Sequence, residues 1–361
     1  MIFERALLRE FSQTATAVFV ALIAVMLSTQ LVRLLGQAAS GRITSEAVVA
    51  LLGFGALGYL PMVLSLTAFI AVLLTLSRAW RDAEMAVWFA SGQPLTAWLA
   101  PVLRFVLPLA LVVGLMTVFV APWAASKSTE YRNRIESRDD VARVTPGTFN
   151  ESTRAERVFF VENVSGEAGE VRNVFVSSMQ HGRIGVMAAA RGYTETMANG
   201  DRFLVLTGGR RYEWQPGSAE FRIMEFDRYA VRIKTREARQ LDPSPKSRPI
   251  WELLRERTPA HQGELVWRLG VPLLAVNLAL LAIPLSFVNP RAGRTNHLIL
   301  ALLAYFTYSN LLGVSQAWVV QGRVSFQSGL IAVHGVVFIA LVLLLVHRQY
   351  IVPLLRRRVR F

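Results

Sequence analysis

The chain has 361 residues and is strongly apolar and basic: 53% are hydrophobic, only 18% are charged, and the formal net charge is +14. This composition excludes extensive disorder, which requires low hydrophobicity. The absence of cysteine excludes a disulfide framework, a Cys-ligated metal site and a Cys nucleophile. A soluble chain this apolar would expose large hydrophobic patches, so the composition indicates membrane spans joined to a soluble part.

Six stretches reach the ~20 apolar residues that a helix needs to cross a hydrocarbon core of about 30 Å. They are Ala15–Leu35, Ala47–Leu76, Ala97–Trp123, Leu265–Val288, His297–Val320 and Phe326–Val346. We therefore expect a membrane α-helical protein with six transmembrane helices. Residues 1–123 would hold the first three spans, residues 124–264 a soluble insert, and residues 265–361 the last three spans with a basic tail.

The distribution of charge predicts the orientation. The insert holds 23 basic and 20 acidic residues, which leaves 16 basic and 5 acidic residues beside or within the spans. A nucleic-acid-binding protein would carry its basic residues on a soluble face, so we expect no nucleic-acid partner. Of the arginines flanking spans, only Arg42 and Arg323 lie on the side of the insert, whereas the opposite side holds eleven: Arg5, Arg9, Arg78, Arg81, Arg291, Arg294, Arg348, Arg356, Arg357, Arg358 and Arg360.

This asymmetry predicts that both termini are cytoplasmic and that the insert faces outward. A cleaved signal peptide is the competing interpretation of the N-terminus, because Ala38-Ala39-Ser40 imitates a cleavage site. The apolar run before it exceeds the 7–15 residues of a typical signal core, which favours an uncleaved first span.

The insert begins as a polar helix, Ala124–Arg143, and then changes to a period of two, which is typical of strands. Turn residues, including Gly208-Gly209, separate five runs: Glu156–Val164, Glu170–Met179, Gly200–Leu206, Arg210–Trp214 and Glu220–Ile233. We expect an all-β domain of sandwich, roll or barrel type, followed by the linker Leu241–Pro249. The domain either docks another protein or holds a lipid chain between two sheets, and the alternation fits both.

Two glycine-rich motifs imitate nucleotide sites. Gly36–Gly41 resembles a phosphate loop, but Arg42 and Ile43 replace the lysine and the hydroxyl that such a loop needs. The G-x-G-x-x-G of Gly53, Gly55 and Gly58 lies inside an apolar span, where small residues allow close helix packing. The five histidines are scattered, and no Ser-His-Asp set is evident. We expect no catalytic residue, no metal and no cofactor, so the chain is not predicted to be an enzyme.

Charged residues within spans are rare and commonly functional. We find no acidic residue in the six spans, which argues against an ion-coupled carrier, and we identify two arginines. Arg104 lies in the cytoplasmic third of its span and can reach the surface. Arg33 lies one turn from the outer end of the first span, beside Gln30. It either extends to the headgroups or meets an anionic phosphate at the outer leaflet, and its position fits both.

The cytoplasmic loop after the second span, about residues 77–92, is longer than a hairpin needs. Arg81, Asp82 and Glu84 precede Met85, Trp88 and Phe89, whose i, i+3, i+4 spacing gives a short helix one apolar face. This helix either lies on the membrane or inserts into a groove of a cytosolic protein. Anionic headgroups would repel Glu84, which favours the protein partner.

These features together resemble the LptF/LptG permease family, and most closely its LptF branch. The resemblance rests on Arg5 and Arg9, the run Leu31–Gly36, the loop with Arg81 and Glu84, and Pro284–Arg294 (PLSFVNPRAGR). It covers the whole chain. It implies a permease subunit of an ABC exporter that extracts lipopolysaccharide from the outer leaflet of the bacterial inner membrane.

The resemblance also implies partners and residue roles. The partners would be an LptG-like paralogous permease, an LptB-like cytosolic ATPase dimer, an LptC-like periplasmic bridge protein, lipopolysaccharide and membrane lipids. The insert would be a periplasmic β-jellyroll, and Arg33 and Gln30 would lie near lipopolysaccharide phosphates. The loop would be the coupling helix, contacting the ATPase through Glu84, Arg81, Asp82, Met85, Trp88 and Phe89. The alternative function is a non-transporting envelope scaffold whose β-domain binds a partner.

Overall fold

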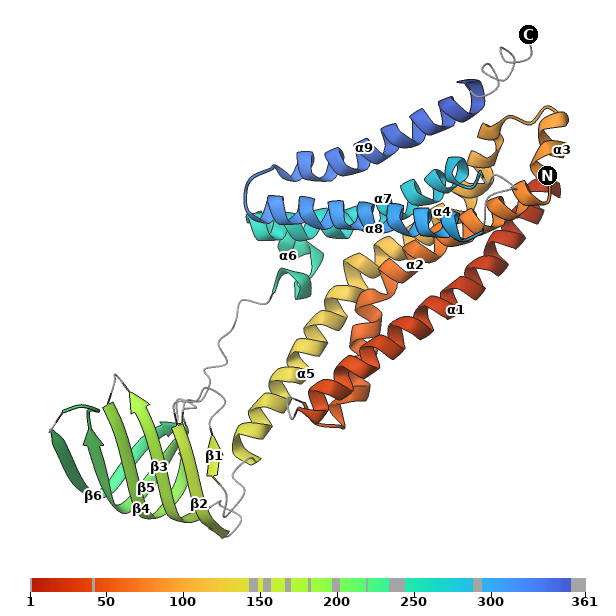
Figure 1. The fold of residues 1–361 in the computed structure, drawn as a ribbon. Helices are drawn as coiled ribbons and strands as arrows, with labels where there is room; N and C mark the ends of the chain where they lie inside the picture. The colour runs from red at the N-terminus through yellow and green to blue at the C-terminus, as the bar shows by residue number, and fades with distance from the viewer. Residues whose placement is uncertain are drawn as a thin grey trace. The chain divides into compact units, whose positions relative to one another are not determined.

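The computed structural model describes residues 2–40, 43–142, 149–151, 157–165, 170–180, 183–196, 202–218, 220–233, 244–287 and 294–351. The chain divides into two compact units. One is helical and consists of Met1–Arg132 with Pro243–Phe361, and the other is Asn133–Asp242, which holds the sheet (Figure 1).

Long helices make up the first unit at the positions of the predicted spans, and several extend well beyond the predicted ends. One of them, α9 (Phe326–Val346), has the predicted bounds, and the Ser325 side chain caps its first turn. The other helices are α1 (Ile2–Ala39), α2 (Ala47–Arg81), α3 (Glu84–Ala90), η1 (Leu95–Trp98), α4 (Leu99–Leu115), the π-helix η2 (Met116–Val120), α5 (Ala121–Ala142), η3 (Pro245–Ser247), α6 (Ile250–Arg255), α7 (Pro259–Leu285), α8 (Arg294–Val320) and the π-helix η4 (His347–Ile351).

Five helical stretches within the described residues are long and apolar enough to cross a membrane: Glu4–Ala39, Ala47–Arg81, Leu95–Asn133, Pro259–Leu285 and Phe326–Gln349. They correspond to five of the six predicted spans. The remaining predicted span, His297–Val320, forms α8, whose 27 residues extend for about 40 Å at the usual helical rise. Its role as a sixth span stays a prediction.

The core of the helical unit surrounds α7, which α2, α4, α8 and α9 contact. Its centre is made of fully buried side chains such as Phe69, Leu73, Leu274 and Leu278. By contrast, α1 lies along α2 (Figure 1) and exposes most of its apolar surface. Lipid tails are as apolar as these side chains, so a membrane removes the cost that this exposure would have in water.

Glycines allow close approach at the crossings of α7, α8 and α9. A Cβ on Gly263 would lie 2.3 Å from Val320 Cγ2, and one on Gly270 would lie 2.6 Å from Leu312 Cδ1. The sequence instead indicated close helix packing at Gly53, Gly55 and Gly58. None of those three has an atom within 4 Å of a Cβ position, so this motif makes no close helix contact among the described residues.

Replacing Gly263 by alanine should therefore destabilise the helical unit by about 1–3 kcal/mol, because the new methyl group meets Val320 and the backbone oxygen of Gln316 at 3.1 Å. The measurement is thermal unfolding of the full chain in detergent. Gly313→Ala is the matched control, since open space surrounds a Cβ there and alanine favours a helix. Equal unfolding temperatures for the two variants would contradict the packing.

The second unit contains one six-stranded antiparallel sheet whose strands follow chain order, as Figure 1 shows. The strands are β1 (Phe149–Glu151), β2 (Arg157–Ser165), β3 (Glu170–Gln180), β4 (Arg183–Thr196), β5 (Arg202–Trp214) and β6 (Phe221–Ile233). The predicted all-β content is confirmed. The two-sheet arrangement of a jellyroll is not confirmed, since the described strands form a single meander.

The predicted turn at Gly208-Gly209 is wrong, because both glycines lie inside β5. Gly208 has a φ of +62°, and a Cβ on Gly209 would lie 2.6 Å from the ring of Phe226. Leu206, three residues before Gly209, is buried in the same cluster as Phe226. Gly208 gives the strand a left-handed residue that changes its side-chain alternation. Gly209 leaves room for the ring of Phe226.

Candidate functional site

The predicted loop helix is α3, a helix of seven residues that begins directly after Ala83. Ala83 is left-handed, with a φ of +60°, and Gly92 beyond the helix has a φ of +86°. These two residues reverse the chain at both ends of α3, so the helix is held between α2 and η1 as a separate short element.

The apolar face of α3 packs on its own chain. Met85 is buried, and the ring centroid of Phe89 lies 5.5 Å from that of Trp80 in α2 and 5.6 Å from that of Trp98 in η1. Trp88 is half-buried and also packs against the core. Phe89 nevertheless stays 37% exposed, so its own chain covers this face only in part. The predicted contact of these side chains with the ATPase stays a prediction. The side that α3 leaves open carries Val87, which is 68% exposed.

Arg78, which the sequence reading did not select, links the charged residues of this loop. Its guanidinium forms ion pairs with Glu10 in α1, with Asp82 at 3.0 Å and with Glu84 at 2.8 Å. A second guanidinium nitrogen reaches the other oxygen of Glu84 at 3.4 Å. Spacing on a helix would find the Arg78–Asp82 pair, but only the fold brings Glu10 to the same guanidinium. Arg81 is exposed beside this group.

The other predicted charged site lies near the opposite end of α1. Arg33 is exposed between the exposed apolar residues Val32 and Leu35, and Gln30 is half-buried one turn earlier. One turn further on, Gln37 accepts a hydrogen bond of 3.4 Å from Arg132 of α5. A second arginine, Arg132, therefore contacts α1 one turn beyond Arg33. By contrast, Arg104 pairs with Glu4 and so bridges α4 and α1.

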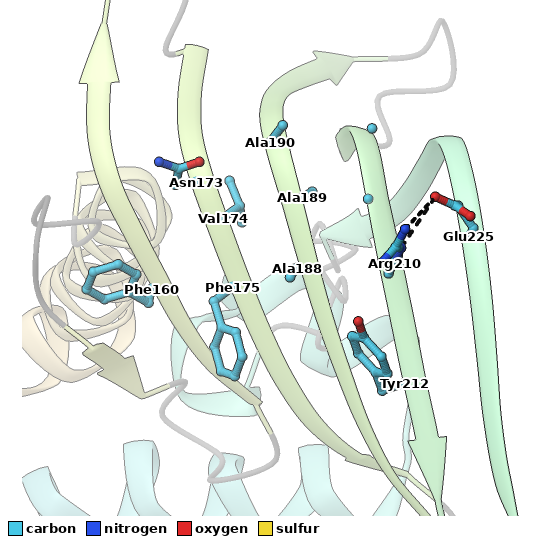
Figure 2. Close-up of a pocket in the computed structure, with 12 residues that line it drawn as sticks. Phe160, Asn173, Val174, Phe175, Ala188, Ala189, Ala190, Arg210, Tyr212 and Glu225 are labelled. Atoms are coloured by element: carbon cyan, nitrogen blue, oxygen red, sulfur yellow. Dashed lines mark hydrogen bonds and ion pairs between the residues drawn. The ribbon is translucent and has the colours of Figure 1, made fainter.

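The sheet carries an open groove of about 500 Å³, drawn in Figure 2. One row of register partners crosses it from β2 to β6: Phe160, Phe175, Ala188, Arg210 and Glu225. The two phenylalanines are at one end and the Arg210–Glu225 ion pair, 3.2 Å long, is at the other. The hydrogen bonds that the Arg210 guanidinium donates to Glu225 raise the pKa of Arg210. The choice between lipid cleft and docking surface stays open.

Buried polar side chains also join the last three helices. The Asn277 side chain in α7 donates to the Tyr308 hydroxyl in α8 at 2.9 Å and to the His334 backbone oxygen in α9 at 3.3 Å. The Tyr308 hydroxyl also bonds to Nδ1 of His334. Hydrogen bonds of this kind fix how α7, α8 and α9 pack in a membrane. An apolar pocket of about 280 Å³ beside Tyr308 lies between these helices.

Comparison with known proteins identifies the family. Residues 5–348 match the family described as "Lipopolysaccharide export system permease LptF/LptG". The chain is 28% identical over 315 residues to the lipopolysaccharide export system permease protein LptF of Escherichia coli strain K12, covering 85% of this chain and 84% of the relative. The LptF protein of Shigella flexneri matches to the same extent. The chain thus belongs to the LptF/LptG family of lipopolysaccharide export permeases and is a multi-pass protein of the inner membrane.

Proposed function

We propose that this chain is the LptF-type subunit of an ATP-driven exporter that extracts lipopolysaccharide from the outer leaflet of the inner membrane. An LptG-like paralogue would complete the permease, and an LptB-like cytosolic dimer would supply ATP hydrolysis. An LptC-like protein would receive the lipid beside the sheet unit, which lies on the periplasmic side in this proposal. The charge asymmetry of the flanks supports cytoplasmic termini.

The observation that carries the proposal is how α3 is attached to the spans. Ring contacts join Phe89 to Trp80 and Trp98, so a force applied to α3 reaches α2 and the start of α4 together. Arg78 adds a second attachment, because it holds both Glu84 and Glu10 of α1. Interiors packed in this way move as rigid pieces rather than by continuous deformation, which suits a helix that transmits a partner's motion.

The contact with the ATPase would use the open side of this loop. Glu84 and Asp82 are 44% and 51% exposed although both pair with Arg78, so a cation of the partner can share them. Arg81 and Val87 complete this surface. Met85, Trp88 and Phe89 would act from behind it, by fixing the position of α3. The predicted ATPase-coupling residues therefore take two different roles in the proposal.

The lipid would lie along the exposed apolar surface of α1, where Val25 and Val32 are the most exposed large hydrophobic residues. Exposed side chains of α8, including Ile299 and Leu303, would add a second apolar surface for acyl chains. Arg33, with Gln30 beside it, would meet a phosphate where α1 approaches the outer leaflet. An arginine suits this contact because its guanidinium can bind a phosphate through two hydrogen bonds.

Purification of the tagged chain from its own membranes tests the assembly. We expect a paralogous permease and a cytosolic ATPase to co-purify in fixed proportion, with ATP hydrolysis that lipopolysaccharide stimulates. The alternative function, an envelope scaffold, predicts a partner of the sheet unit without an ATPase. A homogeneous complex that lacks any ATPase would therefore reject the transporter and favour the scaffold.

A further inference from the structure

The helical unit contains a buried arginine, Arg268 of α7, that the sequence reading overlooked. It lies within the predicted span Leu265–Val288, yet only Arg33 and Arg104 were identified as span arginines. Its side chain is 1% exposed, and its Nε donates to Glu264 at 2.9 Å, with Glu264 7% exposed. A buried ion pair recovers its desolvation cost only when further hydrogen bonds satisfy it, so the remaining contacts of Arg268 are informative.

The guanidinium of Arg268 binds the connector by which the chain returns from the sheet unit. Its Nη2 lies within hydrogen-bonding distance of three backbone oxygens, those of Pro245 at 3.1 Å, Lys246 at 3.3 Å and Arg248 at 2.8 Å. Pro245 and Lys246 belong to η3, the first described element after β6. One side chain thus holds the returning backbone against α7.

The backbone of Arg268 binds the outgoing connector. Its carbonyl oxygen lacks the usual helical donor, because residue 272, four positions later, is a proline without an N–H group. The hydroxyl of Thr117 takes that place at 3.0 Å and is shared with the Gly114 oxygen at 2.9 Å. Thr117 is buried in the π-helix η2, which leads through α5 towards the sheet unit. Single π-turns of this kind are frequent at functional sites.

We propose that Arg268 is a positioning residue that ties both connectors of the sheet unit to α7, so that motion among the spans is transmitted to that unit. The inference rests on the proposed export function. It specifies which residue couples the helical unit to the connectors of the sheet unit. The Nη1 of Arg268 is buried without a hydrogen-bond partner among the described residues, which leaves the guanidinium a free donor when the connector shifts. A buried pair kept for stability alone has no need of this arrangement, since well-packed apolar residues commonly replace such pairs without loss.

The test is the ratio of lipopolysaccharide transferred to ATP hydrolysed, measured with the complete complex in proteoliposomes and a soluble acceptor. The double variant Glu264→Leu with Arg268→Met removes the guanidinium that binds the returning connector, and it leaves no unpaired buried charge. We expect its ATPase activity to stay within about twofold of the parent, whereas lipopolysaccharide transfer falls at least about tenfold. Normal transfer per ATP would overturn the inference.

Thr117→Val provides a second test, because valine has the shape of threonine and leaves the Glu264–Arg268 pair in place. Lipopolysaccharide transfer should fall about threefold with ATPase activity unchanged. Unaltered transfer would overturn the part of the proposal that concerns the outgoing connector, η2 and α5. Thr129→Val is the matched control, since Thr129 of α5 is exposed and, among the described residues, bonds to Ala125 of its own turn. A parent complex that transfers no lipopolysaccharide would instead reject the proposed function.

Discussion

Replacing Glu84 by lysine should remove the cytosolic ATPase from the purified complex and abolish export. The structure gives the reason in charges: Glu84 is half-exposed on α3 and already holds Arg78 through both carboxylate oxygens. A lysine at position 84 would repel Arg78 at this distance and also any cation of the partner. Losing a charge pair at an interface commonly costs about 2–5 kcal/mol, so we expect at least about tenfold weaker binding.

The matched control for this change is Glu10→Gln. Glu10 pairs with the same guanidinium from α1 but does not belong to α3. The control should keep the ATPase bound, since Asp82 and Glu84 still hold Arg78. Binding would be measured by co-purification and by titration of the ATPase onto the immobilised permease. Undiminished binding to the Glu84→Lys variant would show that α3 does not contact the ATPase through this residue.

Replacing Arg33 by glutamate should weaken the response to lipopolysaccharide without loosening the complex. Arg33 is exposed at the far end of α1, away from the Glu10–Arg78 pair, so the ATPase contact should be unaffected. A hydrogen bond between charged groups contributes about 1.5–3 kcal/mol. We therefore expect that roughly ten times more lipopolysaccharide is needed for half-maximal stimulation of ATP hydrolysis.

Arg33→Lys is the matched control here, because it keeps the charge and loses only the paired donors of the guanidinium. Its response should lie between those of the parent and of Arg33→Glu. Stimulation of Arg33→Glu at the parent's lipopolysaccharide concentration would show that Arg33 only extends to the headgroups.

The spans were predictable because a membrane imposes a simple rule on sequence: about 20 apolar residues in a helix. The bounds of α9 were predicted to the residue for this reason. The sheet was harder. Strand β4 was missed because Ala188, Ala189 and Ala190 follow one another without alternation, and alanine has a low preference for strands. Gly208-Gly209 imitated a turn because a sequence cannot show the Phe226 ring that needs the space.

The candidate site was predictable in its residue types but not in its partners. The spacing of Met85, Trp88 and Phe89 correctly indicated one apolar face, yet spacing cannot show what covers such a face. In the structure, Trp80 and Trp98 of the same chain cover it in part, and Phe89 remains 37% exposed. Arg268 could have been found from sequence, because it stands within the predicted span Leu265–Val288. Its partners could not, since they are backbone oxygens about twenty residues earlier, in the predicted linker.

The most direct test of the central claim follows newly made lipopolysaccharide in cells from which this chain is depleted. If the chain is a passive permease moved by a partner's ATP cycle, pulse-labelled lipopolysaccharide should accumulate in the inner membrane and cease to reach the cell surface. Re-expression of the parent chain should restore delivery, whereas Glu84→Lys should not. Delivery at the normal rate in depleted cells, with no paralogue replacing the chain, would contradict the account.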